Sequence, residues 1–404
     1  MKKDWEIKKL GELCELITKG TTPTSIGFDF QNQGINYVKI ESFSEDGTII
    51  ENKVAHISQE CHEALKRSQL QAGDILFSIA GALGRTAVID ESILPANTNQ
   101  ALAIIRLLKK DITFIKFLLY YFKTDFVIKQ IEKDKGGVAQ QNLSLKQIGD
   151  FEINIPPLEE QKRIVKILDE KFAQLETIKA NAQNNLQNAK DLFQSQLTKA
   201  FSNTTWEKKR LGDCGSFKNG MNFAATDSGY TIRSLGVGDF KDRYSIDDTE
   251  TLSEISLKAA PSEDYLLHDG DIVFVRSNGN KELVGRCVLV YPKDIPTTYS
   301  GFCIRFRKAF DLLDADFLLH FMKAESSRKI LNGKEGANIS NLNQKILGDF
   351  EVPLPPLPDQ KRIVKELDTL SEKVKALQNI YEQMLLDCNE LKQAYLQKAF
   401  EGEL

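Results

Sequence analysis

Apolar residues toward the end of the chain recur at alternating steps of four and three positions. Over residues 363–395 these positions are Ile363, Leu367, Leu370, Val374, Leu377, Tyr381, Met384, Cys388, Leu391 and Tyr395. This heptad spacing predicts an α-helix with a single apolar seam, as in a coiled coil. An equivalent stripe lies earlier in the chain: Ile164, Leu168, Phe172, Leu175, Ile178, Ala182, Leu186, Ala189, Phe193 and Leu197. Each segment is expected to form a helix of about 40 residues, roughly 60 Å long at ~1.5 Å per residue.

The two helical segments belong to a longer internal repeat. Residues 149–152 recur as 348–351, 161–169 as 360–368, 199–201 as 398–400, and Trp5-Glu6 as Trp206-Glu207. Within the longest of these segments a single position differs, where Ile167 is replaced by Glu366. Between the shared segments the two copies agree only in traces, such as Gly73-Asp74 against Gly270-Asp271. We infer that the near-identical segments meet a common partner, whereas the two variable bodies recognise different things.

The pattern predicts an α/β protein with two mixed α/β bodies separated by two long helices. The two apolar seams are expected to pack on each other as an antiparallel coiled coil, because this pairing needs no long return of the chain and gives a pseudo-twofold repeat. The expected boundaries are 1–155 for the first body, 156–205 for the first helix, 206–353 for the second body and 354–404 for the second helix.

Each body shows short apolar runs between Gly, Asn and Ser loops, which predicts a strongly bent sheet. One amphipathic helix is expected per body, over 114–131 and 316–330, followed by a strand that leads into a Pro-Pro pair. The predicted strands are 74–79, 86–89, 102–107, 151–155, 272–275, 286–290, 302–306 and 350–354.

The composition describes a globular chain that is not basic overall. Its 404 residues include 53 Lys+Arg and 57 Asp+Glu, a formal net charge of −4, which argues against DNA binding through bulk charge. The basic residues gather locally, however: over 276–308 they outnumber acidic ones seven to two, whereas acidic residues dominate 239–271. Such a basic stretch suits phosphate contact, although a solvated basic face fits the charge equally well.

Targeting and metal-binding signals are missing from the sequence. The N-terminal residues lack an apolar leader, and no stretch approaches the ~18 apolar residues of a membrane span, so we expect a cytoplasmic protein. Six cysteines without a CxxC pair and four dispersed histidines predict neither disulfides nor a metal site.

Catalytic motifs are also missing. An adenine methyltransferase would carry Asn or Asp before a Pro-Pro-aromatic segment, but here Pro156-Pro157 and Pro355-Pro356 follow Ile or Leu. Gly236-Val237-Gly238 is a lone GxG and predicts a turn. The carboxylates Asp387 and Glu390 beside Lys392 lie on the predicted helix and read as its polar surface, not as a nuclease site. No catalytic residue is therefore expected.

The repeated Pro-Pro-Leu-x-x-Gln-Lys-Arg-Ile-Val junctions resemble those of the specificity (S) subunits of Type I restriction-modification systems, the HsdS family. The likeness covers the whole chain and includes the segments Gly73-Asp74-Ile75-Leu76-Phe77-Ser78 and Asn99-Gln100-Ala101. It implies that each body is a target recognition domain for one half of a bipartite double-stranded DNA site. The helices would set the length of the spacer between the two halves. The sequence has no obvious short tandem repeat in the central spacer, so this length cannot be inferred by counting repeats.

The resemblance also implies partners for a chain that is not itself an enzyme. Two N6-adenine methyltransferase (M) subunits would dock on the repeated helices, and ATP-dependent restriction (R) subunits would join through them, in phage defence and DNA methylation. No cofactor is expected in this subunit, since S-adenosylmethionine, ATP and Mg would bind to the partner subunits.

Loop residues of both bodies are the candidates for DNA contact, and repeated residues of the junctions are the candidates for partner contact. By residue type alone, Gly and Asn in these loops more often serve turn structure than DNA contact, and the Lys-Arg pairs more often form a solvated helix face than bind phosphate, although their duplication favours a partner contact. The DNA-contact candidates are Lys19, Thr21, Thr22, Ser78, Arg85, Asn97, Asn99, Gln100, Gln140, Gln141, Asn142, Lys218, Asn219, Arg276, Ser277, Asn278, Arg286, Tyr299, Asn338 and Ser340. The partner-contact candidates are Gln161, Lys162, Arg163, Gln360, Lys361 and Arg362.

A different class of function stays open from the residues alone. A coiled-coil scaffold that holds two protein-binding modules, without DNA specificity, would show the same duplicated helices and divergent bodies.

Overall fold

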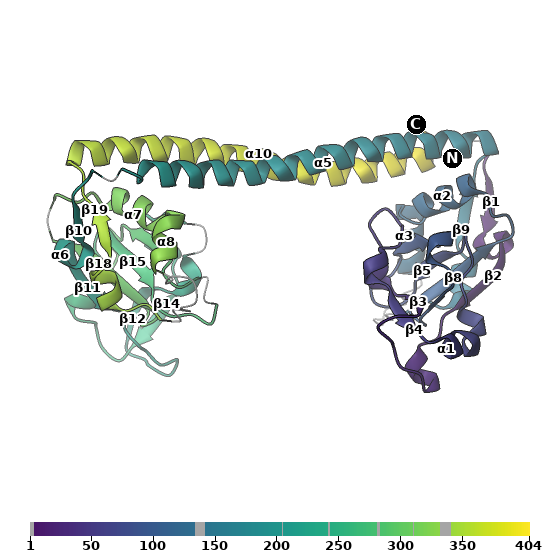
Figure 1. Cartoon of the computed structure of the whole chain (residues 1–404), viewed down its shortest axis with the longest axis horizontal. Helices are drawn as coiled ribbons and strands as arrows, with labels where there is room; N and C mark the ends of the chain where they lie inside the picture. The colour runs from purple at the N-terminus through teal and green to yellow at the C-terminus, as the bar shows by residue number, and fades with distance from the viewer. Residues whose placement is uncertain are drawn as a thin grey trace. The chain divides into compact units, whose positions relative to one another are not determined.

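A computed structural model describes residues 4–133, 142–203, 205–240, 243–280, 283–309, 311–331 and 341–404. The chain divides into two compact units, of which unit 1 comprises residues 1–182 and 383–404 and unit 2 comprises residues 183–382. Each unit holds one α/β body and parts of the two long helices, α5 (Leu158–Ala200) and α10 (Leu357–Glu401) (Figure 1). Among the described residues, no helix is both long enough and apolar enough to cross a membrane.

The body of unit 1 contains three small sheets. A four-stranded sheet has the order β2-β8-β5-β6, a three-stranded sheet has the order β4-β3-β7, and β1 pairs with β9. Every residue of β8 is buried, as expected for a central strand that is covered on both faces. The elements are β1 (Glu6–Lys9), β2 (Cys14–Lys19), β3 (Ile35–Val38), β4 (Ala55–Ile57), α1 (Gln59–Ala64), β5 (Ile75–Ser78), β6 (Thr86–Val88), β7 (Ala96–Thr98), β8 (Leu102–Leu107), α2 (Ile112–Tyr121), α3 (Asp125–Lys133), α4 (Leu145–Gly149) and β9 (Glu152–Ile155).

The body of unit 2 repeats this plan with one more strand in the larger sheet. The orders are β11-β18-β15-β16-β13 and β14-β12-β17, and β10 pairs with β19. The elements are β10 (Lys208–Arg210), α6 (Leu211–Cys214), β11 (Gly215–Asn219), β12 (Tyr230–Leu235), β13 (Ser245–Ile246), β14 (Glu254–Leu257), β15 (Asp271–Val275), β16 (Cys287–Val290), β17 (Thr297–Tyr299), β18 (Cys303–Lys308), α7 (Ala315–Lys323), α8 (Glu325–Leu331), α9 (Gln344–Gly348) and β19 (Glu351–Pro353).

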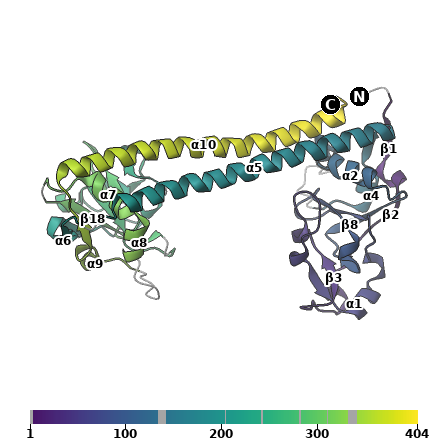
Figure 2. The same cartoon turned by 45° about the horizontal axis from the view of Figure 1, so that its top comes forward.

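The long helices pair antiparallel inside each unit, which confirms the sequence prediction (Figure 2). In unit 1, Arg163 near the start of α5 donates to the backbone oxygen of Leu404 at 2.7 Å. Further along α5, Glu176 accepts from Lys392 of α10 at 3.2 Å. Later residues of α5 therefore contact earlier residues of α10, as in an antiparallel pair. In unit 2, Phe193 and Leu197 share one core with Ile363, Leu367 and Val374 from the other end of α10.

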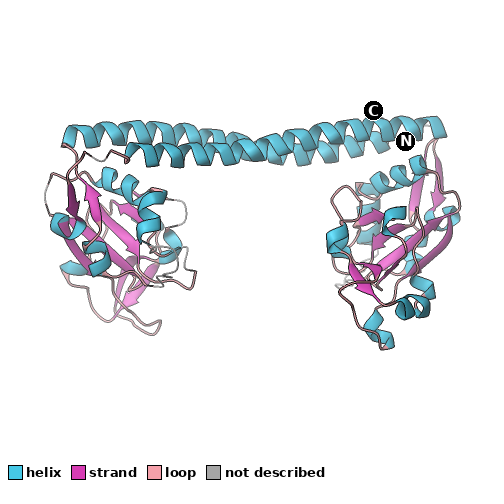
Figure 3. Ribbon diagram, viewed as in Figure 1, coloured by secondary structure: helices cyan, strands magenta, loops and turns pink. Residues whose placement is uncertain are grey.

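The repeated Lys-Ala-Phe segment closes the core of each body. Phe400 of α10 is fully buried, and its ring centroid lies 5.2 Å from both Phe117 and Tyr121 of α2. At the end of α5, Phe201 lies 5.3 Å from Phe317 and 5.2 Å from Phe321 of α7. In each unit, therefore, α2 or α7 lies between the strands and the long helices (Figure 3).

The seam of α10 differs from the predicted heptad near its end. Leu391 is 47% exposed, while Leu396, Ala399 and Phe400 are buried. The reason is that this end of α10 packs on α2 as well as on α5, so the buried face turns away from a strict two-helix seam.

Each body has two short helices where one amphipathic helix was expected. The segment predicted as 114–131 is broken between α2 and α3, where the Thr124 hydroxyl donates to the backbone oxygen of Tyr121 at 2.7 Å. The segment predicted as 316–330 is broken at Ala324, which lies between α7 and α8 in an extended conformation. Side-chain bonding to the backbone competes with helix continuation, and apolar periodicity alone does not reveal it.

Substitution of Phe400 tests how far the end of α10 stabilises unit 1. The variant Phe400→Ala removes a buried aromatic ring and should lower the free energy of unfolding of this unit by about 3–5 kcal/mol. The chain has two tryptophans, Trp5 in the unit 1 core and Trp206 in the unit 2 core. Urea denaturation of a Trp206→Phe background, followed by Trp5 fluorescence, measures the loss.

The control for this experiment is Leu391→Ala on the same helix, where an exposed side chain is shortened. It should change the free energy of unfolding by no more than about 0.5 kcal/mol. The converse variant, Phe201→Ala, is made in a Trp5→Phe background, where it should lower the free energy of unfolding that Trp206 fluorescence reports for unit 2. Equal effects of Phe400→Ala and Leu391→Ala would contradict the role assigned to this ring.

Candidate nucleic-acid interface

Two loops cross at one end of the larger sheet in unit 1. The loop after β2 passes over the loop between β7 and β8, where Gly20 N–H donates to the Leu102 oxygen at 3.3 Å and Thr21 N–H to the Thr98 oxygen at 3.1 Å. A Cβ on Gly20 would lie 2.0 Å from the Thr98 oxygen, so this crossing requires glycine. The two loops carry the candidates Lys19, Thr21, Thr22, Asn99 and Gln100.

Unit 2 builds the same crossing from different residues. Gly220 N–H donates to the Cys303 oxygen, and Met221 N–H donates to the Tyr299 oxygen, both at 3.0 Å. A Cβ on Gly220 would lie 2.1 Å from the Ser300 oxygen. Lys-Gly-Thr and Asn-Gly-Met segments thus occupy matching places in the two bodies.

A third strand end joins each crossing. In unit 1, Ile79 N–H donates to the Ala101 oxygen at 2.9 Å, and Leu143 N–H donates to the Ile79 oxygen at 2.9 Å. In unit 2 the same two bonds run from Arg276 to Phe302 and from Leu342 to Arg276, both at 2.8 Å. We call this set of joined loops the platform; it comprises residues 19–22, 78–80, 98–101 and 142–143 in unit 1, and 218–222, 275–278, 299–302 and 341–342 in unit 2.

The platform bonds show which positions of the two bodies are equivalent. Ile79 of unit 1 corresponds to Arg276 of unit 2, and Ala101 corresponds to Phe302. In unit 1 the Thr22 hydroxyl hydrogen-bonds the Gln100 side chain, whereas in unit 2 the Asn222 amide lies over Gly301, which has no side chain. The backbone is therefore conserved between the two platforms while their side-chain chemistry differs.

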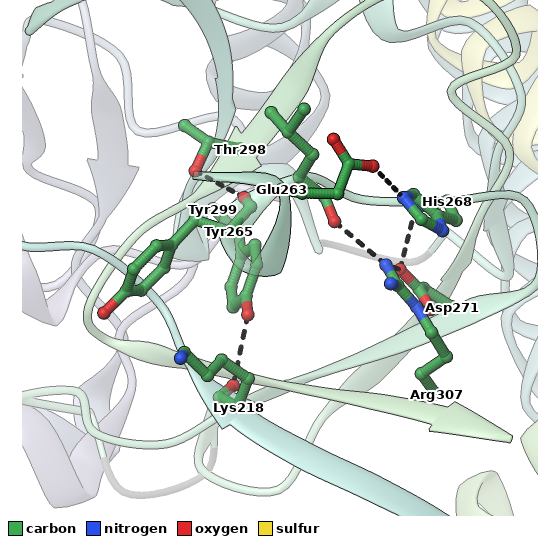
Figure 4. Close-up of polar contacts among 9 residues, drawn as sticks. Lys218, Glu263, Tyr265, His268, Asp271, Thr298, Tyr299 and Arg307 are labelled. Carbon is green, nitrogen blue, oxygen red and sulfur yellow. Dashed lines mark hydrogen bonds and ion pairs between the residues drawn. The ribbon is translucent and has the colours of Figure 1, made fainter. Parts of the chain in front are cut away.

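Most described candidates present at least part of their side chain to solvent. Arg85, although exposed, donates to the Phe43 oxygen at 2.9 Å. Lys218 lies 4.8 Å from the Tyr265 ring centroid and 3.3 Å from Asp264, as Figure 4 shows for its position beside Tyr265. The exposed candidates are Lys19, Arg85, Gln100 and Asn142, and the half-buried ones are Thr21, Thr22, Asn99, Lys218, Asn219, Arg276, Ser277, Asn278 and Arg286.

Three candidates are buried and bonded inside the protein. The Ser78 hydroxyl accepts from Arg85 N–H at 2.8 Å, and the Asn97 amide donates to the Leu65 oxygen at 3.1 Å and to Ser68 Oγ at 2.9 Å. Tyr299 donates to the Lys218 oxygen at 3.3 Å, and burial raises the pKa of its phenol to about 12. These side chains support the platform from below. Gln140, Gln141, Asn338 and Ser340 lie outside the described residues.

Each body has a buried ion pair that was not predicted from the sequence. Asp74 lies directly before β5 and Asp271 at the start of β15, at the opposite end of these strands from the platform. In unit 1, Arg106 binds Asp74 with two hydrogen bonds of 2.8 and 2.7 Å. In unit 2, Arg307 binds Asp271 with the same two distances (Figure 4). Both aspartates are buried, and hydrogen bonding to them raises the pKa of each arginine. The repeat of Gly-Asp before β5 and β15 was the signal that could have revealed these pairs.

The ion pair corrects the picture of one basic stretch in unit 2. Arg307 points into the protein toward Asp271, and Arg305 is buried with 5% of its surface exposed. Arg305 and Arg307 are two positions apart on β18 and share one face of the strand. Because Arg305 is buried and Arg307 is paired with Asp271, this part of the basic stretch does not form a basic surface. Arg276 and Arg286 are the members of the stretch that lie at or next to the platform.

The repeated junctions place their polar residues in two different ways. Gln161 is buried and donates to the Pro156 oxygen at 2.8 Å, and Gln360 is buried and donates to the Pro355 oxygen at 2.8 Å. These glutamines fix the turn before each long helix. The cationic neighbours lie outward with acidic partners at helical spacing: Lys162 with Glu159, Arg163 with Glu160, and Arg362 with Asp359 and Glu366, while Lys361 is exposed.

Comparison with known proteins places this arrangement in a class. A family model described as the Type I restriction modification DNA specificity domain matches residues 2–188 and again residues 203–385. The two matches include the two platforms, so the class is that of a chain with two DNA specificity domains.

The chain belongs to the family of specificity subunits of type I restriction-modification systems, which recognise DNA sequence. Relatives include the StySPI specificity subunit of Salmonella potsdam, 28% identical over 71% of this chain and 65% of that protein. The putative MjaX specificity subunit of Methanocaldococcus jannaschii is 25% identical over 94% of this chain and 90% of its own. This chain therefore spans about two thirds of the Salmonella protein and most of the Methanocaldococcus one. The resemblance seen in the repeated junctions is confirmed.

Solved structures show the same fold. A chain from work on complex assembly and conformational transition of the type I R-M system superposes with a TM-score of 0.80. It is 22% identical, and the match covers 100% of this chain and 99% of that one. The HsdS subunit of Thermoanaerobacter tengcongensis gives a TM-score of 0.61 at 20% identity, over 100% and 98% of the two chains.

The contribution of the buried ion pair to stability can be tested in unit 1. Arg106→Ala leaves the buried Asp74 carboxylate without its cation and should lower the free energy of unfolding by about 3–5 kcal/mol. Urea denaturation followed by Trp5 fluorescence in the Trp206→Phe background measures it. Lys9→Ala, which breaks the exposed Lys9–Asp150 pair, is the control and should leave the midpoint unchanged. If both variants unfold at the wild-type urea concentration, the pair does not stabilise the body of unit 1.

Proposed function

We propose that the chain is the non-catalytic subunit that reads a bipartite double-stranded DNA site, one half with each body. The observation that carries this proposal is the duplicated platform, in which one backbone arrangement presents two different sets of side chains. A shared backbone would dock on DNA in the same way twice, and different side chains would read different base sequences. Identical platforms would instead favour a palindromic site.

The platform residues have the chemistry that base and phosphate contact requires. Amide and hydroxyl groups of Thr22, Asn99 and Gln100 can hydrogen-bond base edges in the major groove. In unit 2, Arg276 and Asn278 offer the same kinds of contact. The cations Lys19, Arg85, Lys218 and Arg286 are suited to phosphates, which position a protein on the duplex without reading its sequence.

The long helices serve in this proposal as a spacer of fixed length between the two half-sites. Helices of 43 and 45 residues are far longer than the three or four turns that are usual in globular proteins. Their antiparallel pairing in each unit stiffens them, because each buries apolar residues against the other. Rigid spacing between two readers sets half-site separation in other DNA-binding proteins as well.

The outward cations of the repeated junctions are proposed to seat the methyltransferase partners. Lys162, Lys361 and Arg362 lie near the start of α5 or α10, where the two helices are nearly identical in sequence. Two copies of one M subunit would therefore each find an equivalent surface. R subunits would join through M, and S-adenosylmethionine, ATP and Mg would be bound by these partners. The proposal places the complex in the cytoplasm, where the host DNA is methylated and foreign DNA is cut.

A scaffold that holds two protein-binding modules is the competing proposal. Electrophoretic mobility shifts with the chain and its methyltransferase distinguish the two, using duplexes that contain the N6-methyladenine motif mapped in the host with and without this gene. Sequence-selective retardation supports DNA reading. If scrambled duplexes bind as strongly as duplexes with the motif, DNA reading is wrong and the scaffold function remains.

Exchange of one body tests whether the two half-sites are read separately. Replacement of residues 5–155 with the corresponding body of a relative should change one half of the methylated motif and leave the other half as it was. The reason is that each platform is built within a single unit. Sequencing of N6-methyladenine sites in cells that carry the chimera reads out the motif. A change in both halves would refute modular reading.

Lengthening both long helices tests their role as a spacer. Seven residues inserted after Ala182 in α5 and seven after Glu382 in α10 preserve the pairing and add about 10 Å at ~1.5 Å per residue. The spacer in the methylated motif should grow by about three base pairs at ~3.4 Å each. Insertion into α5 alone is the control and should abolish methylation, because the two seams lose register. If the double insertion leaves the spacer length unchanged, the long helices do not set the distance between the half-sites.

A further inference from the structure

Phe302 is exposed at the centre of the unit 2 platform. It is 59% exposed and is the most exposed aromatic side chain in the described part of the chain. A ring of this size is normally buried, because leaving it in water is unfavourable. A second ring, Phe223 at 39% exposed, directly follows Asn222 on the neighbouring loop. Singly exposed apolar side chains are common on protein surfaces, but two exposed rings on neighbouring loops of the platform form a small apolar site that a partner can cover.

The backbone of Phe302 is held from three sides, although its ring is exposed. Its oxygen accepts from Arg276 N–H at 2.8 Å, and its own N–H donates to Ser300 Oγ at 3.3 Å. The preceding residue, Gly301, donates to the Met221 oxygen at 2.7 Å. The ring therefore projects from a fixed base, and little conformational entropy is lost when it inserts into a partner.

The equivalent position in unit 1 carries Ala101, as the shared hydrogen bonds to Ile79 and Arg276 establish. Next to it, Gln100 of unit 1 is replaced by Gly301, and Pro23 is replaced by Phe223. The unit 2 platform thus carries two aromatic rings where unit 1 carries Ala101 and Pro23, and it lacks the polar side chain of Gln100. This difference between the bodies is local, since the backbone beneath it is the same.

We propose that Phe302 inserts between two neighbouring base pairs of the half-site that the second body reads, while the first body leaves its half-site stacked. The inference rests on the proposed function. Apolar side chains that enter a base step unstack it and kink the duplex, and the cost depends on the sequence of that step. Contact with a thymine methyl group would cover only an edge of the ring, whereas insertion covers both faces. Phe302 would thereby select flexible steps that it does not hydrogen-bond.

The test uses 2-aminopurine, whose fluorescence rises when it is unstacked. The chain is assembled with its methyltransferase and bound to duplexes of the mapped motif, with 2-aminopurine placed in turn at each non-methylated position of both half-sites. Wild type should brighten the probe at one step of the second half-site only. Phe302→Ala should abolish this signal and weaken binding about tenfold or more, since unstacking no longer opens extra contacts.

Two control variants and one modified duplex make the outcomes distinct. Phe302→Leu keeps an apolar wedge and should retain most of the signal, and Ile330→Ala, at a 67% exposed position of α8, should bind as wild type does. Duplexes with deoxyuridine for thymine should bind wild type unchanged. A loss with deoxyuridine that Phe302→Ala no longer shows would identify a methyl contact and overturn insertion.

The remaining outcomes separate this inference from the function on which it rests. If wild type binds the motif selectively and Phe302→Ala matches it in affinity and fluorescence, insertion is wrong and DNA reading stands. If wild type shows no sequence-selective binding, the proposed function fails, and insertion fails with it.

Discussion

The packing of each long helix end onto one α/β body is the interaction on which the rest of the structure depends. Phe400 and Phe201 occupy equivalent places, and each completes a core that the strands and short helices of its body leave open. The same two helices bury their apolar seams against each other. Body and helix therefore cannot be stabilised independently, and any partner that holds the helices also holds the cores of the bodies.

A second duplicated feature joins strands of the larger sheet in each body. The Asp74–Arg106 and Asp271–Arg307 pairs lie at the ends of equivalent strands, opposite the platforms, and have the same bond lengths. Buried pairs of this kind add little net stability but fix geometry, because any shift leaves a charge unpaired. The pairs thus fix the same strands in both bodies, while the platform residues at the other ends of these strands differ.

The sequence revealed the features that are local or repeated, and it failed where contacts join distant residues. Heptads and duplicated junctions predicted the helices and their antiparallel pairing, and the junctions identified the family. Loop composition selected loops that the structure joins in the platforms, and their contact with DNA stays a prediction. It could not show that Asn97 and Tyr299 are buried or that Phe302 is exposed, because these outcomes depend on which loops cross. Alignment of the two copies through Gly20 and Gly220 would have shown which loop positions are equivalent in the two bodies.

The position of Phe400 in α10, after the second body, has a consequence for synthesis on the ribosome. The first body is translated before the second, but its core stays incomplete until α10 has also emerged, since α10 supplies Phe400, Ala399 and Leu396. The second body meets Phe201 from the helix that directly precedes it. During translation the second body can therefore close its core before the first, which leaves the earlier-made domain exposed to proteases and in need of protection for longer.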